Sequence, residues 1–198
     1  MLTTRHSHPK RVSTPARKPS EDADLRFQLF LKITQAVSES TDFNSALAAT
    51  LEGVCAALGW DHCEAWVPSS DGEVLEFRPV CCASREGLHP FRLFSEGIAF
   101  GPGIGLPGRV WASRQPEWIA DISASSENFR FQIAKEAGLK TSLGIPVIAG
   151  GRVVAVLVFF AFKLRKEDKA HIETISMIAG HLGPVVELKR AEQALRES

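Results

Sequence analysis

Cysteine and histidine are the residue types in this 198-residue chain best suited to redox chemistry or metal binding. The cysteines are Cys55, Cys63, Cys81 and Cys82, and the last two are adjacent. Neighbouring residues of a strand point to opposite faces, so Cys81 and Cys82 cannot readily bond to each other or chelate one metal together. Cys82 with the nearby His89 could still form a metal-ligand pair or a thiol switch. The alternative is that both cysteines are small core hydrophobes.

A glycine-rich stretch, residues 97–108, is the second feature that could do chemistry. It contains no GK[ST] and no GxGxxG that follows a strand and opens a helix, so it predicts none of the usual phosphate-binding loops. Turn formation accounts for its glycines. His181, in the segment AGHLGP, lacks the acidic neighbour of a phospho-accepting histidine, which indicates a surface or packing position.

The composition is that of a soluble globular protein, with 44% hydrophobic and 23% charged residues. Its formal net charge is zero, which gives no support for a nucleic-acid partner. The longest apolar run, residues 153–162, has about half the length that a membrane helix needs, so we expect no membrane segment. Without a CxxC motif or a signal-like apolar run, the sequence favours a reducing, cytoplasmic setting. Residues 1–23 are basic and contain prolines, and we expect them to form a disordered tail.

Hydrophobic periodicity predicts helices at both ends of the chain. The first helices cover residues 24–38 and 43–58, the second beginning at a cap on Asp42 and ending at Gly59. Cys55 lies on the apolar stripe of this second helix. A long helix closes the chain over residues 167–198, with a packing seam at Ile172, Ile175, Ala179, Leu182 and Val186.

Between these helices the pattern predicts a sheet. Strands are expected at residues 63–67, 74–83, 118–120, 142–148 and 153–162, and the last is apolar on both faces, which places it centrally. A short helix is expected over residues 126–138. Alternation in the second strand would put Leu75, Phe77 and Cys81 against the helices, with Glu76, Arg78, Val80 and Cys82 on the other face beside Glu64 and Trp66.

Three segments carry a family resemblance: GLPGRVWAS, RQPEWIADI and AGLKTSLGIPVIAGGRVVAVLVF. Together they resemble a GAF domain over residues 24–186. The resemblance implies an α/β (α+β) fold with a central antiparallel sheet of five or six strands. The helices from both termini would pack on one face, and loops with a short helix would form a pocket on the other. Residues 187–198 resemble a helical linker towards a following module or partner.

The resemblance further implies a non-catalytic sensory or regulatory module of a bacterial-type signalling protein, such as a sensor histidine kinase of a two-component system. A change in the pocket or in a homodimer formed through the terminal helices would be relayed by the closing helix to a downstream signalling module. The alternatives are a small thiol redox enzyme or sensor of the methionine sulfoxide reductase type that uses Cys82, and a haem- or chromophore-binding sensor that uses His89. Bilin-binding GAF domains attach the pigment to a cysteine in the short helix expected over residues 126–138. Residues 128–138 read NFRFQIAKEAG and contain no cysteine, so a covalent bilin at that position is excluded. The sequence requires no cofactor and no metal.

The expected pocket would bind a small molecule through apolar residues and a few polar anchors. Arg109, Asp121 and Ser142 are the candidate anchors. The complete set of candidate pocket residues is Trp66, Val80, Cys82, Phe91, Phe100, Arg109, Trp111, Asp121, Phe129, Ile133, Ser142 and Phe160. The competing interpretation is that the aromatic members simply form a hydrophobic core.

Overall fold

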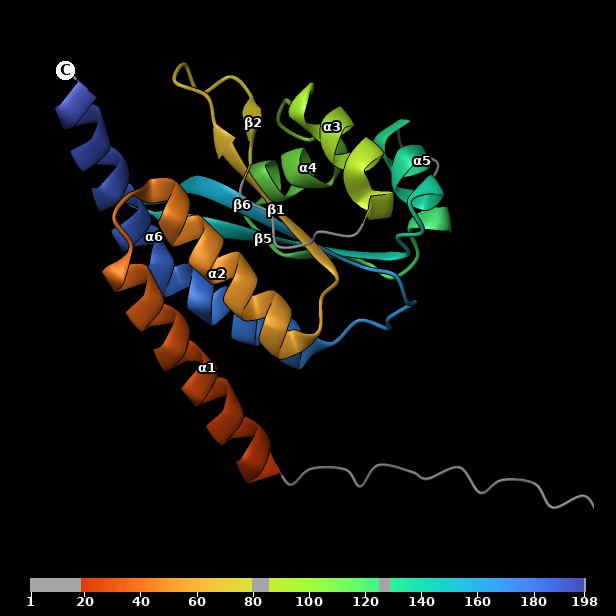
Figure 1. Ribbon diagram of the computed structural model, residues 1–198, viewed down its shortest axis with the longest axis horizontal. Coiled ribbons are helices and arrows are strands. Elements are labelled where there is room, and N and C mark those ends of the chain that lie inside the picture. The colour runs from red at the N-terminus through yellow and green to blue at the C-terminus, as the bar shows by residue number, and fades with distance from the viewer. Residues whose placement is uncertain (1–18, 80–85, 125–128, 198) are drawn as a thin grey trace, which may run out of the picture.

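A six-stranded antiparallel sheet forms the centre of the molecule in the computed structural model, which describes residues 19–79, 86–124 and 129–197 (Figure 1). The strand order is β3-β2-β1-β6-β5-β4, so the apolar strand β6 is central, as its sequence predicted. The strands are β1 (His62–Pro68), β2 (Leu75–Arg78), β3 (Ala99–Phe100), β4 (Glu117–Ile119), β5 (Thr141–Ala149) and β6 (Arg152–Ala161).

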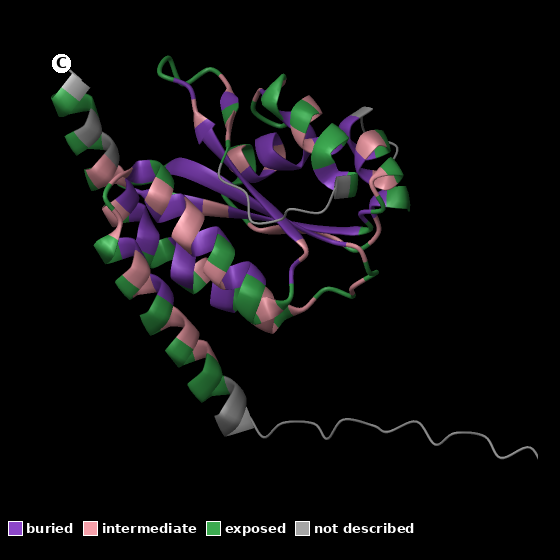
Figure 2. Ribbon diagram, in the orientation of Figure 1, coloured by how far each residue is buried: buried purple, intermediate pink, exposed green. Residues whose placement is uncertain are grey.

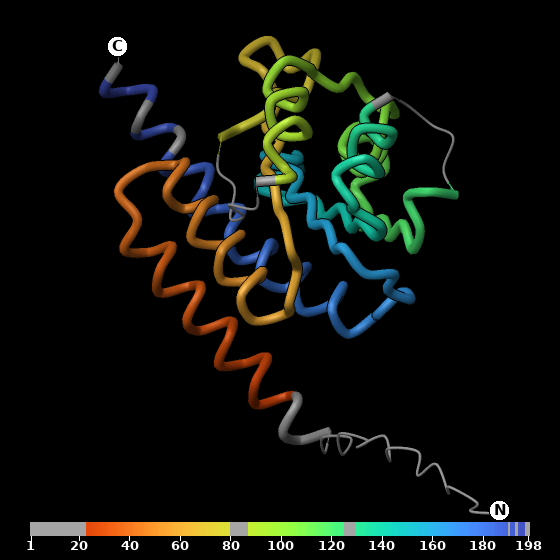
Figure 3. Tube along the Cα trace, turned by 45° about the vertical axis from the view of Figure 1, so that its right-hand side comes forward, coloured from red at the N-terminus to blue at the C-terminus, as the bar shows by residue number. Residues whose placement is uncertain are grey.

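Three helices cover one face of this sheet: α1 (Pro19–Glu39), α2 (Phe43–Leu58) and α6 (Lys169–Glu197). The two terminal helices α1 and α6 pack against each other and run in the same direction, as Figures 1 and 3 both show. Asp42 caps α2 in a capping box with Ser45, and Gly59 ends it in the left-handed conformation at φ 68°. Helix α1 begins at Pro19, so residues 19–23, which the sequence placed in a tail, are helical.

The other face carries the helices α3 (His89–Glu96), α4 (Gly105–Ser113) and α5 (Phe129–Glu136), with short 3₁₀ turns at Glu86–Leu88 and Ile122–Ala124. Helix α3 was not among the helices expected from the sequence. Helix α4 packs closely on the sheet at Gly144 of β5. A Cβ atom at this position would lie only 2.7 Å from Val110 Cγ2, so the glycine permits the close approach. The layered arrangement predicted from the sequence is confirmed.

The sheet therefore separates two hydrophobic cores (Figure 2). The first core lies against α1, α2 and α6 and takes Cys63, Ala65 and Val67 from β1. The second core lies against α3, α4 and α5 and takes Trp66 from the same strand. Successive residues of β1 thus alternate between the two cores.

The predicted facing of β2 is wrong. Phe77 pairs directly with Trp66, and Leu75 pairs with Pro68. Residues directly opposite each other in an antiparallel pair share a face, so Leu75 and Phe77 join the second core rather than the helices of the first. Placing the pairing one residue out of register is enough to exchange the two faces.

Candidate functional site

Four of the aromatic residues predicted to line a pocket come together in the second core. Trp66 of β1, Phe91 of α3, Phe100 of β3 and Phe160 of β6 are all at most 5% exposed. Trp66 contacts Phe100 edge-on at 4.8 Å between ring centroids, and Phe91 contacts Phe160 in the same way at 5.3 Å. Ile133 of α5 is half-buried against this group.

The guanidinium of Arg130 lies among these rings. It comes from the first turn of α5, and the residue is only 3% exposed. The Arg130 Cζ atom lies 4.5 Å from the ring centroid of Phe91, 5.2 Å from Trp66, 5.5 Å from Phe160 and 5.8 Å from Phe100. Cations are stabilised over aromatic faces at such distances, and more strongly where water is excluded.

Glu64 of β1 supplies the opposite charge, fully buried and in an ion pair with Arg130. Its carboxylate also accepts a hydrogen bond from Trp66 Nε1 at 3.2 Å and lies 3.3 Å from His62 Nε2. Burial alone would raise the pKa of Glu64, but Arg130 and these hydrogen bonds outweigh it and lower the pKa to about 2. The carboxylate is therefore ionised at neutral pH.

Ser95 of α3 completes this buried polar group. Its hydroxyl lies 3.4 Å from Glu64 Oε1 and accepts hydrogen bonds of 3.2 Å from Arg130 Nε and Nη2. Glu64, Arg130, Ser95 and His62, hereafter the buried ionic cluster, thereby connect β1, α3 and α5. Its charges are paired and surrounded by rings, an arrangement that fixes the two helices to the sheet.

The three predicted polar anchors do not join this cluster. Arg109 forms a half-exposed ion pair with Glu117 on β4, at 2.7 Å. Asp121 accepts hydrogen bonds from Ser123, which lower the pKa of Asp121 below its usual value. Ser142 is fully buried on β5, and its hydroxyl has no hydrogen-bond partner within the described residues.

Several of the candidate residues lie outside the buried ionic cluster or outside the described residues. Val80 and Cys82 fall outside the described residues, as does the side chain of Phe129. His89 is exposed at the start of α3. No cluster of three His, Cys, Asp or Glu residues suited to a metal ion occurs in the described part of the chain.

The described cysteines lie in the first core, on the opposite side of the sheet from the aromatic group. Cys55 is buried on α2, as predicted. Cys63 is buried on β1 and disulfide-bonded.

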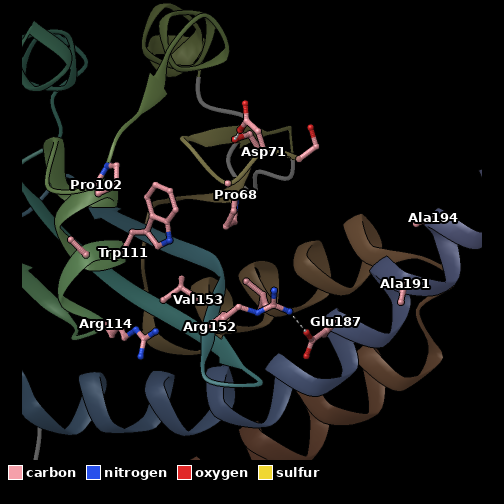
Figure 4. Close-up of a pocket in the computed structure, with 15 residues that line it drawn as sticks. Pro68, Asp71, Pro102, Trp111, Arg114, Arg152, Val153, Glu187, Ala191 and Ala194 are labelled. Carbon is pink, nitrogen blue, oxygen red and sulfur yellow. Dashed lines mark hydrogen bonds and ion pairs between the residues drawn. The ribbon is translucent and has the colours of Figure 1, made fainter.

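A surface cavity of about 750 Å³ lies where β1 ends and β6 begins, next to the C-terminal part of α6 (Figure 4). Only Trp111 was predicted as a pocket residue among those that line it. The cavity is formed by the β1–β2 turn, the end of α4, the start of β6 and one side of α6, through Pro68, Ser69, Ser70, Asp71, Gly72, Pro102, Trp111, Ala112, Arg114, Arg152, Val153, Val154, Glu187, Ala191 and Ala194.

No helix among the described residues combines the length and the hydrophobicity needed to cross a membrane. Solved structures with this fold include the free methionine-R-sulfoxide reductase of Neisseria meningitidis in complex with its substrate. That comparison has a TM-score of 0.69 and 19% identity, and covers 94% of this chain and 99% of the other. The GAF domain of a phosphoenolpyruvate-protein phosphotransferase from Coxiella burnetii has a TM-score of 0.72 at 22% identity, over 87% of this chain and 98% of the other.

A plant relative matches over a shorter segment. The truncated basic helix-loop-helix protein A of Pisum sativum is 37% identical over 78 residues, which is 37% of this chain and 22% of the plant protein's length. The sequence profile of the GAF domain matches this chain over residues 40–187, from the end of α1 into α6. Because this match covers most of the chain and agrees with the sheet and helix layers, the chain belongs to the GAF domain family.

Proposed function

We propose that this chain is a non-catalytic sensory or regulatory module, and that α6 relays a change in the domain to a second copy and to a following signalling module. GAF domains commonly have regulatory roles, and the fold of this chain is theirs. The buried ionic cluster also supports a structural role for the second core rather than a catalytic one, because its charged groups already bind one another.

The observation that carries the proposal is that α6 has two apolar stripes. The inner stripe, from Ile175 to Val186, is buried in the first core against β5. The outer stripe is exposed and spaced by three and four residues at Leu188, Ala191 and Leu195, which is the spacing of a coiled-coil seam. Leu188 is 59% and Leu195 77% exposed. Because the inner stripe packs on the sheet and the outer stripe is exposed to a partner, a movement of the sheet can be passed through α6 to that partner.

Helix α1 offers matching apolar surface. Leu25, Phe27 and Leu31 are 45–56% exposed, and α1 runs beside α6 in the same direction (Figure 1). A parallel bundle of α1 and α6 from two copies would cover both sets of residues. Burial of each large aliphatic side chain is worth about 1.5–3 kcal/mol, which gives such a bundle its driving force.

Size-exclusion chromatography with light scattering at micromolar concentration tests this assembly. We expect a dimer for the native chain and a monomer for Leu188→Glu/Leu195→Glu, because two carboxylates would enter the seam. Leu93→Glu/Leu164→Glu is the matched control, since these leucines are 59% and 62% exposed but lie outside α1 and α6. A monomeric native chain, or equal dissociation of both variants, would contradict the dimer.

A thiol redox enzyme is the second candidate, supported by the shared fold with the Neisseria reductase. Cys55 and Cys63 lie in the first core, on the other side of the sheet from the aromatic group, and Cys63 is disulfide-bonded, so Cys82 is the thiol to test. Assay of free methionine-R-sulfoxide reduction by the native chain and by Cys82→Ser tests it. We expect no thiol-dependent turnover; turnover that is lost in Cys82→Ser would establish the enzyme instead.

A further inference from the structure

We propose that the surface cavity beside α6 binds a small planar aromatic anion, with its ring against Trp111 and its carboxylate on Arg114 and Arg152. This inference goes beyond the regulatory role proposed above, because it assigns a ligand class to a cavity, which the dimer proposal does not. The cavity volume of about 750 Å³ falls in the range of 300–1,000 Å³ that is usual for drug-sized ligands.

The cavity offers an apolar surface for a ring. Pro68, Pro102, Val153 and the half-buried Trp111 all line it. In Figure 4 the indole of Trp111 stands between Pro102 and Pro68, with Val153 below it. A flat indole on the cavity wall favours a planar aromatic group over a flexible chain, because such a ligand stacks on the ring and loses little conformational freedom on binding.

Two arginines and two carboxylates line the cavity. The Asp71 carboxylate is committed to its own turn, accepting from Ser69 Oγ at 2.6 Å and from the Glu73 amide at 3.0 Å. Glu187 lies 3.3 Å from Arg152 Nη2. The side chain of Arg114 is exposed and makes no hydrogen bond or ion pair with the described residues, and only its backbone N–H is bonded, to the carbonyl of Val110 at 2.9 Å. One guanidinium therefore remains available, and guanidinium groups bind carboxylates through paired, charge-assisted hydrogen bonds.

Arg152 is the second point of attachment. Its side chain is 78% exposed and its ion pair with Glu187 bridges the β5–β6 turn to α6, as the dashed line in Figure 4 shows. Exposed ion pairs of this kind are worth little, so a bound carboxylate can replace Glu187 on Arg152. Glu187, Ala191 and Ala194 lie on α6 where it continues past the first core, so the bound anion would also contact this helix.

The test is a titration of the native chain with 2-naphthoate, followed by the indole N–H signals of uniformly ¹⁵N-labelled protein. The Trp111 signal is assigned by its loss in Trp111→Phe. We expect a saturable shift of this signal with a dissociation constant of about 1 mM or below, a modest affinity for a ligand of this size. 2-Naphthamide, which has the same ring without the charge, is expected not to saturate the site.

Three substitutions identify the binding groups. Arg114→Gln should weaken 2-naphthoate binding about tenfold, whereas Glu187→Gln should strengthen it several-fold by removing the competing carboxylate. Arg92→Gln makes the same charge change at an exposed arginine of α3 outside the cavity and should leave the affinity unchanged. The absence of a saturable Trp111 shift overturns the proposal. So does equal binding of 2-naphthamide, an unchanged affinity in Arg114→Gln, or equal weakening in Arg92→Gln.

Discussion

A buried guanidinium depends on its carboxylate partner far more than an exposed one does, because neither charge can return to water without unfolding. In this chain, Arg130 has Glu64 as that partner, and Ser95 and four aromatic rings complete its surroundings. The half-exposed pair of Arg109 and Glu117 has the same chemistry at the surface. These two pairs make an internal comparison of how burial changes the energy of an ion pair.

Arg130→Met should lower the free energy of unfolding by about 3–5 kcal/mol, because it leaves the Glu64 carboxylate buried without its charge partner. Arg109→Met should cost about 1 kcal/mol or less, since its pair is partly solvated. In the double variant Glu64→Gln/Arg130→Met, part of the loss should be recovered, as no uncompensated charge remains. Urea denaturation of the four proteins measures these values. Equal losses for Arg130→Met and Arg109→Met would contradict the buried pairing.

The same carboxylate predicts how stability depends on pH. The pKa of Glu64 is about 2 in the folded chain against 4.5 as its ordinary value, so the unfolded chain takes up the proton first as the pH falls. The contribution of Glu64 is therefore complete above about pH 4.5 and is lost between about pH 4.5 and 2.

Glu64→Gln removes this dependence. The difference in unfolding free energy between the native chain and Glu64→Gln should shrink as the pH falls from 5 to 3, by at most about 1.4 kcal/mol per pH unit. Asp42, Asp71 and Asp121 also have lowered pKa values, but they are present in both proteins and cancel in the difference. A pH-independent difference would show that Glu64 is not held ionised by its partners.

Sequence patterns located the aromatic half of this interior and missed the ionic half. Glu64 and Trp66 were correctly placed on one face of β1, but Glu64 was not identified as a buried charge. Arg130 lies far along the chain on α5, and a charged residue in a short helix is normally solvated. The available signal was the run His62, Glu64 and Trp66, which puts two polar residues beside a tryptophan on one strand face. Pairing across such a sequence separation depends on tertiary packing.

At the scale of single elements, close approach between backbones decides where α6 can lie. A Cβ placed on Gly183 would lie 2.1 Å from the carbonyl oxygen of Ile148, next to a register irregularity between Val147 and Ile148 in β5. Gly180, one turn earlier on the same helix, is exposed and has no atom within 4 Å of its Cβ position. Substitution of Gly183 therefore tests the close packing of α6 on β5, whereas substitution of Gly180 tests helix propensity alone.

Gly183→Ala should lower the free energy of unfolding by about 1–3 kcal/mol, because the backbone of β5 or α6 must shift to admit the methyl group. Gly180→Ala should raise it by about 0.5–1 kcal/mol, the usual gain of alanine over glycine inside a helix. Thermal or urea unfolding of the two variants checks both signs. A gain in both would mean that α6 does not approach β5 so closely.

At the scale of the whole molecule, the layered fold was largely predictable because it follows from amphipathic periods. The apolar stripes of α2 and α6 and the two apolar faces of β6 must all be buried. A sheet with helices packed on both faces buries all of them. The facing of β2 and the strand β3 were not predictable in the same way. β3 has only two residues, and the face of β2 depends on the exact length of the turn after Pro68.

The two ends of the chain should contribute very differently to stability. Helix α1 inserts Ile33 and Val37 into the first core, where they are 2% and 1% exposed, and its Phe30 contacts His181 of α6 at 4.6 Å between ring centroids. In contrast, the described residues of α6 beyond Val186 add no side chain to either core. Deletion of residues 1–39 should therefore cost about 3–6 kcal/mol of unfolding free energy, from two buried aliphatic side chains alone.

Deletion of residues 190–198 should leave the thermal midpoint within about 2 °C of the native value, since a change below about 0.5 kcal/mol shifts it no further. It keeps Glu187 on Arg152 and Lys189 on the carbonyl of Ser40, and it removes Leu195 from the outer stripe. Calorimetry at a concentration where the protein is monomeric measures stability, and light scattering at higher concentration measures assembly. The deletion should thus separate the two properties, losing the dimer while keeping the fold. A loss of stability comparable to that of the α1 deletion would instead make this segment part of the folded core.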